Sequence, residues 1–190
     1  MKAKLIGKSL MAALVVTGAG TCVKSGMDFY ASLPTMLKNY KKIFVTTKKD
    51  EDPLLLLKVY SDYYNVPREL SLAVAKQENL KDWENNDAVS NKGAVGIMQI
   101  IPKYHVGPGK TCSGIVSNWT ELVGKEHRRE NINCGIKILR TCLDYSFKNK
   151  TIKSIDEQID SAIMGYNNSR SYAKAVVYSA LMERIRDKSL

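Results

Sequence analysis

Acidic side chains are missing from one long stretch of the chain. No Asp or Glu occurs between Ala88 and Thr120, although the 190 residues include 19 acidic ones. An apolar segment that begins at Leu70 precedes this stretch and ends at Glu78. The start of the acid-free stretch is rich in small residues, so we expect a loop beside this carboxyl group. One acid beside a loop that holds no second acid indicates acid–base chemistry by a single carboxyl group.

Long apolar runs are also scarce. The uncharged run from Ser9 to Val23 follows three lysines, but it is shorter than the roughly 20 apolar residues that span a bilayer. A basic start followed by a short apolar run is typical of a secretory signal. We expect residues 1–23 to be a signal peptide, or a weak signal-anchor held through residues 9–23. A lipid-modified Cys22 and a buried N-terminal helix are less favoured. We therefore expect export to the periplasm or cell envelope.

Strand-like alternation and internal repeats are absent as well. Residues 24–52 are basic, end in a charged stretch and lack a core pattern, so we interpret them as a tether. Residues 53–190 then form one domain. Its apolar residues recur every three or four positions, which is typical of helices. The expected fold is mainly α, with at most a short β-hairpin in the 80s and 90s of the chain.

Five helices are expected. Three of them start at Pro53, Pro67 and Asn131, and the other two are marked by apolar stripes that run from Ile159 to Tyr166 and from Tyr172 to Ile185. Gly135 is unusual inside a helix because it costs about 1 kcal/mol relative to Ala, so we expect another helix to approach closely there. The apolar stripe of the last helix is expected to consist of Tyr172, Ala175, Val176, Ser179, Met182 and Ile185.

The charge balance is strongly basic. The formal net charge is +10, which favours anionic partners or simply good solubility. The Lys and Arg residues are scattered rather than gathered with aromatic residues, so nucleic acid is not the expected partner. An anionic cell wall or membrane surface fits the charge equally well.

Cysteines number four, and their spacing limits their pairing. Cys134 and Cys142 lie eight residues apart on one expected helix, which separates them by about 12 Å, too far for a disulfide. Cys112 could pair with either of them, and we favour Cys134. The alternatives are free buried thiols and a zinc site made of His105, Cys112, His127 and Cys134. These spacings differ from the tight pairs of structural zinc sites, so we expect no metal and no cofactor.

Glu78 is the candidate catalytic residue. It stands where the helix from Pro67 ends, at the negative end of the helix dipole, which disfavours ionisation. Burial against apolar neighbours would act in the same direction. Both effects favour the protonated form that a general acid needs. Asp87 is the nearest other acid before the loop, and we expect it to stabilise or solvate a turn.

Four motifs together resemble a known family. They are AVAKQEN, AVSNKGAVGIMQIIP, ENINCGIKIL and AIMGYNN, and they are similar to the motifs of the soluble-lytic-transglycosylase (SLT) domain of glycoside hydrolase family 23. The resemblance implies a lysozyme-like α fold that acts on the glycan strands of peptidoglycan. It implies cleavage of the β-1,4 bond between N-acetylmuramic acid and N-acetylglucosamine, with Glu78 as the acid and then the base. The product would be a 1,6-anhydro sugar, formed without water.

The resemblance also assigns substrate-binding residues. They are Ser90, Gly96, Met98, Gln99, Tyr166 and Asn167. In the family the motif tyrosine lies against the catalytic acid, whereas Asn131 with Gly135 would shape the helix beneath the site. Core packing of Met98 and plain burial of Tyr166 are the structural alternatives. The chain departs from the family in having Asn79 after the acid and Asn168-Ser169 after the Tyr-Asn pair, which leaves the detailed substrate contacts open.

Other functions fit parts of the pattern. A hydrolytic muramidase of the goose-lysozyme type would share the fold, but it would need a second carboxylate to position water. A non-catalytic peptidoglycan-binding assembly protein would keep the fold without the acid. The setting could be a cell-envelope secretion machine or a phage lysis system.

Overall fold

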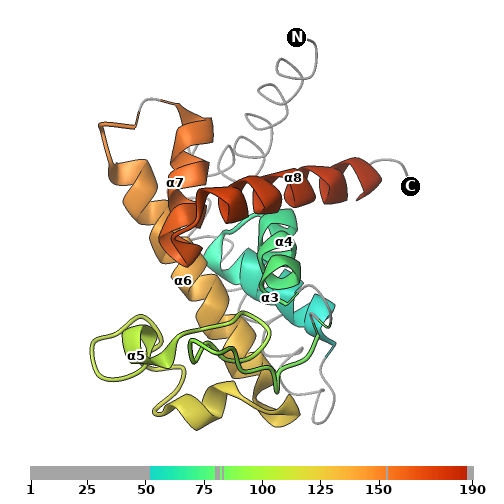
Figure 1. Ribbon diagram of the computed structural model, residues 1–190, viewed down its shortest axis with the longest axis vertical. Coiled ribbons are helices and arrows are strands. Elements are labelled where there is room, and N and C mark those ends of the chain that lie inside the picture. The colour runs from blue at the N-terminus through green and yellow to red at the C-terminus, as the bar shows by residue number, and fades with distance from the viewer. Residues whose placement is uncertain (1–51, 80–81, 83, 153, 188–190) are drawn as a thin grey trace, which may run out of the picture.

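The computed structural model describes residues 52–79, 82, 84–152 and 154–187 (Figure 1). The segments expected at 1–23 and, apart from Asp52, at 24–52 lie outside these ranges. The described residues form six α-helices and two short 3₁₀ helices. They are α3 (Pro53–Tyr64), α4 (Arg68–Glu78), α5 (Pro102–His105), η1 (Trp119–Leu122), η2 (Lys125–His127), α6 (Arg128–Lys148), α7 (Ile155–Asn167) and α8 (Arg170–Asp187). The mainly α expectation is confirmed for this part of the chain, and it fits a lysozyme-like domain.

The first two helices follow directly from local sequence signals. Pro53 begins α3, and the Asp52 side chain accepts a hydrogen bond from the Leu54 amide, as expected of an N-cap. Asn65 ends the helix in the left-handed conformation. Pro67 then precedes α4, whose buried side chains fix it in the core. The last residue of α4 is Glu78.

The five long helices of the described residues pack around one shared core. α6 packs against α3 and α7, while α4 packs against α8, and α7 also contacts α8. In Figure 1, α8 lies across α4, and the loops around α5 gather at the far end of α6. The core contains fully buried apolar side chains from the helices and from the loop after α4. Among them are Val74, Ile97, Met98, Ile132, Ile136, Leu139, Ile163 and Val176.

The loop after α4 contains bridges rather than a regular hairpin. Val89 pairs with Val95, and Val95 pairs with Ile100, as isolated antiparallel bridges. No longer strand occurs within the described ranges. Gly93 and Gly96 have positive φ angles of 74° and 73°, which glycine adopts without the usual penalty. The expected hairpin is thus reduced to a compact double turn.

Three details of the helical expectations were wrong. α6 begins at Arg128, three residues before Asn131. The neighbour that requires Gly135 is the Met98 side chain and not another helix, because an added Cβ would lie 2.5 Å from Met98 Cγ. On α8, Met182 and Ile185 are exposed. The buried face of α8 contains Tyr172 and Val176, as expected, together with Ala173 and Ala180.

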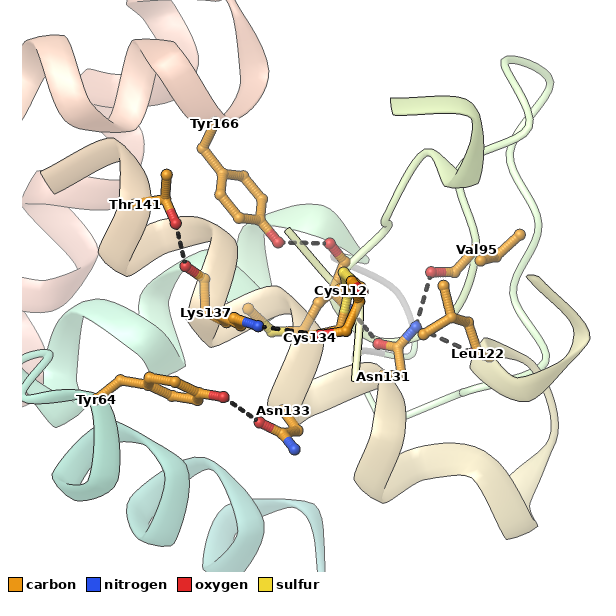
Figure 2. Close-up of a disulfide and its surroundings, with 12 residues drawn as sticks. Tyr64, Val95, Cys112, Leu122, Asn131, Asn133, Cys134, Lys137, Thr141 and Tyr166 are labelled. Atoms are coloured by element: carbon orange, nitrogen blue, oxygen red, sulfur yellow. Dashed lines mark hydrogen bonds between the residues drawn. A yellow bond between two sulfur atoms is a disulfide. The ribbon is translucent and has the colours of Figure 1, made fainter. Parts of the chain in front are cut away.

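A disulfide ties the loop region to α6. It joins Cys112 to Cys134, with the two Cα atoms 5.3 Å apart, and Figure 2 shows it beside the helix. The pairing removes both thiolates from the alternative zinc site. Cys142 is a free, half-buried cysteine. None of the described helices combines the length and hydropathy that a membrane span requires.

Candidate active site

The carboxyl group of Glu78 is held by two side chains from other helices. Tyr172 on α8 donates its hydroxyl hydrogen to Glu78 Oε1 at 2.7 Å. The Asn167 side-chain amide, at the end of α7, donates to Oε1 at 3.1 Å and lies 3.5 Å from Oε2. Burial raises the pKa of Glu78 above its usual value, and these two hydrogen bonds offset part of that rise. The carboxyl group of Glu78 therefore stays protonated up to a higher pH than that of an exposed glutamate.

Tyr172 was not among the residues predicted from the sequence. It was placed on the apolar stripe of the last helix, where its hydroxyl needs a polar partner once it is buried. The structure supplies that partner in Glu78. A tyrosine on an otherwise apolar stripe was the available signal, but the sequence does not show which polar group it meets.

Tyr166 holds the loop after α4 through its hydroxyl group. The charge of Glu78 also acts on this hydroxyl. The Tyr166 hydroxyl donates to the Met98 carbonyl oxygen at 2.8 Å; Tyr166 is labelled in Figure 2. Burial and the nearby Glu78 raise the pKa of Tyr166 well above its usual value, so the phenol remains a donor. The two tyrosines thus contact different parts of one site.

Two buried asparagine side chains fix the loop from below. Asn131 accepts a hydrogen bond from the Met98 amide. It also donates to the carbonyls of Val95 and Leu122, as seen in Figure 2. Asn86 accepts from the Ile97 amide and donates to the carbonyls of Leu122 and Gly124. The expected structural role of Asn131 agrees with these contacts. Asn86 was missed, because nothing in the sequence distinguishes it from its neighbour Asn85.

The four loop residues predicted to bind substrate all take part in the loop's own structure. Met98 is fully buried, and its amide and carbonyl are hydrogen-bonded to Asn131 and Tyr166, which agrees with the structural alternative of core packing. Gly96 is buried between Asn131 and Asn86. Ser90 Oγ accepts from the Ala94 amide, and Gln99 Nε2 donates to the Gly96 carbonyl. Their contacts with a glycan stay a prediction.

Carboxylates other than Glu78 do not join this arrangement within the described residues. Neither the hydrogen bonds to Glu78 nor the causes of its pKa shift include a second acid. The Asp87 side chain is exposed. The side-chain amide of Asn79 donates to the Asp82 carbonyl oxygen at 2.6 Å, so this departure from the family pattern shapes the exit from α4.

Comparison with known families identifies the domain. The model of the transglycosylase SLT domain matches residues 56–180. A comparison with curated proteins found no match, and neither did a comparison with solved structures. The match covers most of the chain and confirms the resemblance carried by the four motifs. The chain therefore belongs to the transglycosylase SLT domain family, which implies lytic-transglycosylase-type cleavage of peptidoglycan.

Proposed function

We propose that the protein is a peptidoglycan lytic transglycosylase in which Glu78 serves first as acid and then as base. It cleaves the β-1,4 bond between N-acetylmuramic acid and N-acetylglucosamine and leaves 1,6-anhydro ends. The observation that carries the proposal is the half-buried Glu78 carboxyl group, held by Tyr172 and Asn167 with a raised pKa.

The proton moves twice in this reaction. Protonated Glu78 gives its proton to the glycosidic oxygen as the C1–O bond breaks, and the leaving sugar departs as an alcohol. The resulting carboxylate then takes the proton of the muramic C6 hydroxyl while that oxygen bonds to C1. A raised pKa supports the first step, since the acid must hold its proton near neutral pH. The two donors support the second, because they stabilise the carboxylate between the steps.

An internal nucleophile suits the groups around Glu78. Glycosidases that use water or an enzymic nucleophile place a second carboxylate within about 5–9.5 Å of the acid. Among the described residues, the partners of Glu78 are a phenol and an amide, neither of which activates water as a carboxylate does. This favours the C6 hydroxyl over water.

The proposed glycan-binding residues come from two parts of the chain. Asn167 comes from α7, whereas Ser90, Gly96, Met98 and Gln99 come from the loop. Because Met98 is fully buried, its proposed contribution is to fix the backbone of the loop. Tyr166 would act by holding that backbone through its hydrogen bond to the Met98 carbonyl.

Mass spectrometry of digested peptidoglycan sacculi tests the proposal. The wild type should release muropeptides with anhydro ends, each lighter by one water than the hydrolysis product. Glu78→Gln should release none, whereas Glu84→Gln, which alters an exposed acid, should act as the wild type does. Reducing ends would instead identify a hydrolytic muramidase. Equal cleavage by Glu78→Gln would overturn the assignment of the acid, and binding without cleavage by the wild type would indicate an assembly protein.

Export to the periplasm or cell envelope is part of the proposal. It is supported by the lysines and uncharged run of residues 1–23, and by the Cys112–Cys134 disulfide, a bond typical of oxidising compartments. A cell-envelope secretion machine and a phage lysis system are the two proposed settings. N-terminal sequencing of the protein recovered from cells tests the first segment: loss of residues 1–23 supports a signal peptide, and their retention supports an anchor.

A further inference from the structure

Three lysine side chains are linked through the loop that follows Pro102. Lys110 Nζ donates a hydrogen bond to the Lys103 carbonyl oxygen at 2.6 Å. The Ser113 amide donates to the Lys110 carbonyl oxygen at 3.0 Å, and the Ser113 carbonyl oxygen accepts from Lys137 Nζ of α6 at 3.4 Å. Lys103, Lys110 and Lys137 are thus connected through one short turn of the chain, and we call them the lysine cluster.

An exposed aromatic ring accompanies the lysine cluster. Tyr104 is 62% exposed, and Lys103 Nζ lies 5.8 Å from the centre of its ring. The ring of His105 lies 6.5 Å from the ring of Tyr104. Burial first, and the charge of Lys110 second, lower the pKa of His105, so this histidine is neutral near neutral pH. The loop therefore combines positive charge with an exposed ring.

Acidic side chains of the described residues do not neutralise the lysine cluster. No Asp or Glu lies between residues 88 and 120, and the ion pairs of the described part of the chain all involve other basic groups. The next acid along the chain, Glu121, accepts a hydrogen bond from the Asn118 side chain. Each ammonium group has three hydrogens, of which the contacts above use one each from Lys110 and Lys137. The cluster therefore has donors for an anion that comes from outside.

The lysine cluster follows the candidate active site closely along the chain. Lys103 lies five residues after Met98, whose carbonyl oxygen accepts a hydrogen bond from Tyr166, and the charge of Glu78 acts on this tyrosine. Five residues of fully extended chain span at most about 18 Å. A peptide of about four residues spans about 13–14 Å when extended, and each lysine adds the length of its own side chain. A peptide attached to a sugar beside Glu78 therefore has the length to reach the cluster.

The anionic groups of the proposed substrate are on its peptides. N-acetylglucosamine is uncharged, and the carboxyl group of N-acetylmuramic acid is joined as an amide to the stem peptide, which carries free carboxylates. Hydrogen bonds between an ammonium group and a carboxylate are stronger than those between neutral groups. A strand without its peptides offers the lysine cluster no such partner.

We propose that the lysine cluster binds the stem-peptide carboxylates of the glycan strand that is cleaved at Glu78. The exposed ring of Tyr104 offers a surface for the apolar part of the same peptide. This inference rests on the proposed function and names its substrate class, which is glycan strands that still carry their stem peptides.

The test compares two double variants, each of which removes two positive charges. Lys103→Gln with Lys110→Gln changes the lysine cluster, whereas Lys148→Gln with Lys150→Gln changes two exposed lysines at and just after the end of α6. Cleavage is measured on strands with intact stem peptides and on strands from which an amidase has removed them.

The expected effect is confined to one variant and one substrate. The cluster variant should have a KM about 3- to 10-fold higher than the wild type on peptide-bearing strands, as expected of two screened ion pairs, with kcat unchanged. On bare strands it should match the wild type, which also shows that it is folded. The control variant should match the wild type on both substrates.

Ionic strength provides a second measurement. Because salt screens exposed charges, the KM of the wild type on peptide-bearing strands should rise with NaCl, and the KM of the cluster variant should rise less. An equal rise of KM on both substrates in the cluster variant, or no rise on either, would overturn the proposal. Loss of binding to anionic lipid vesicles or to DNA, with KM on peptide-bearing strands unchanged, would overturn it in favour of another anionic partner.

Failure of the proposed function is a separate outcome. If the wild type forms no anhydro ends, or if Glu78→Gln remains active, the proposed reaction is wrong. Binding of peptide-bearing strands is therefore also measured with Glu78→Gln alone and together with the two cluster substitutions. Weaker binding of the combined variant to peptide-bearing strands, and equal binding to bare strands, would still support the lysine cluster.

Discussion

Asn131 occupies the space that a side chain at Gly96 would need. An ideal Cβ on Gly96 would lie 2.5 Å from Asn131 Cγ and 2.7 Å from Asn86 Oδ1. Two features together therefore require glycine at position 96. One is its positive φ of 73°, and the other is its contact with the side-chain amides of Asn131 and Asn86. These amides in turn bind the backbone of the loop beside Glu78. The small residues of the loop thus allow polar side chains to reach its backbone.

Gly96→Ala should destabilise the protein more than Gly93→Ala does. The positive φ costs about 1–2 kcal/mol in either variant. At Gly93 nothing lies within 4 Å of the added Cβ, so no further cost is expected. At Gly96 the displaced amides should add about 1–3 kcal/mol. Urea denaturation of both variants measures the difference, and equal free energies of unfolding would contradict the role given to the two asparagines.

Asn131→Ala should be among the most destabilising single changes in the loop region. It leaves the buried Met98 amide without its partner, which costs about 1–3 kcal/mol. It also removes one of the hydrogen bonds to the Val95 carbonyl and one to the Leu122 carbonyl, at about 0.5–1.5 kcal/mol each. Asn133→Ala is the matched control on the same helix, because it removes a single hydrogen bond, from Tyr64. We expect a loss of about 3–5 kcal/mol against about 1 kcal/mol, measured by denaturant unfolding. Similar losses would show that Asn131 does not hold the loop.

Local patterns predicted the elements of the fold well. Helical spacing, the prolines at helix starts and the small residues after α4 are all local signals, and they correctly put Glu78 at a helix end. The need for close approach at Gly135 was also correctly read from its poor helix propensity. Its neighbour was not, because a glycine indicates that space is needed and does not show what fills it.

Contacts between distant segments were the part that the sequence did not reveal. The partner of Tyr172 lies 94 residues away, and its position depends on how α8 crosses α4. Asn86 is one of several asparagines after α4, and only burial distinguishes it. The exposure of Met182 and Ile185 likewise depends on which face of α8 meets its neighbour. Helical spacing alone fits both the true stripe and the expected one.

Reduction of the Cys112–Cys134 disulfide should weaken the domain. The bond closes a loop with a sequence separation of 22, for which the chain-entropy estimate is about 3 kcal/mol. Dithiothreitol should therefore lower the urea midpoint of the wild type by a corresponding amount. A double variant with Cys112→Ala and Cys134→Ala should start at the lower midpoint and show no response to the reductant. A wild type that is insensitive to reduction would contradict a structural role for the bond.

Glu78→Gln should abolish cleavage and yet stabilise the fold near neutral pH. The folded-state pKa of Glu78 is raised by burial, so the stability that its protonated form contributes is fully present below the unfolded-state pKa. That contribution is lost as pH rises through the folded-state pKa. Glutamine is neutral throughout, and its one oxygen can accept the hydrogen bonds from Tyr172 and Asn167. The variant should therefore have a higher Tm than the wild type above this pH window.

The advantage of Glu78→Gln should shrink when thermal unfolding is followed toward acid, because the wild-type carboxyl group is then neutral as well. Glu84→Gln, at an exposed position, should stay within about 0.5 kcal/mol of the wild type at every pH. A Glu78→Gln variant less stable than the wild type at neutral pH would mean that the two donors stabilise the carboxylate more than burial destabilises it. In that case the raised pKa, and with it the argument for a protonated acid, would be wrong.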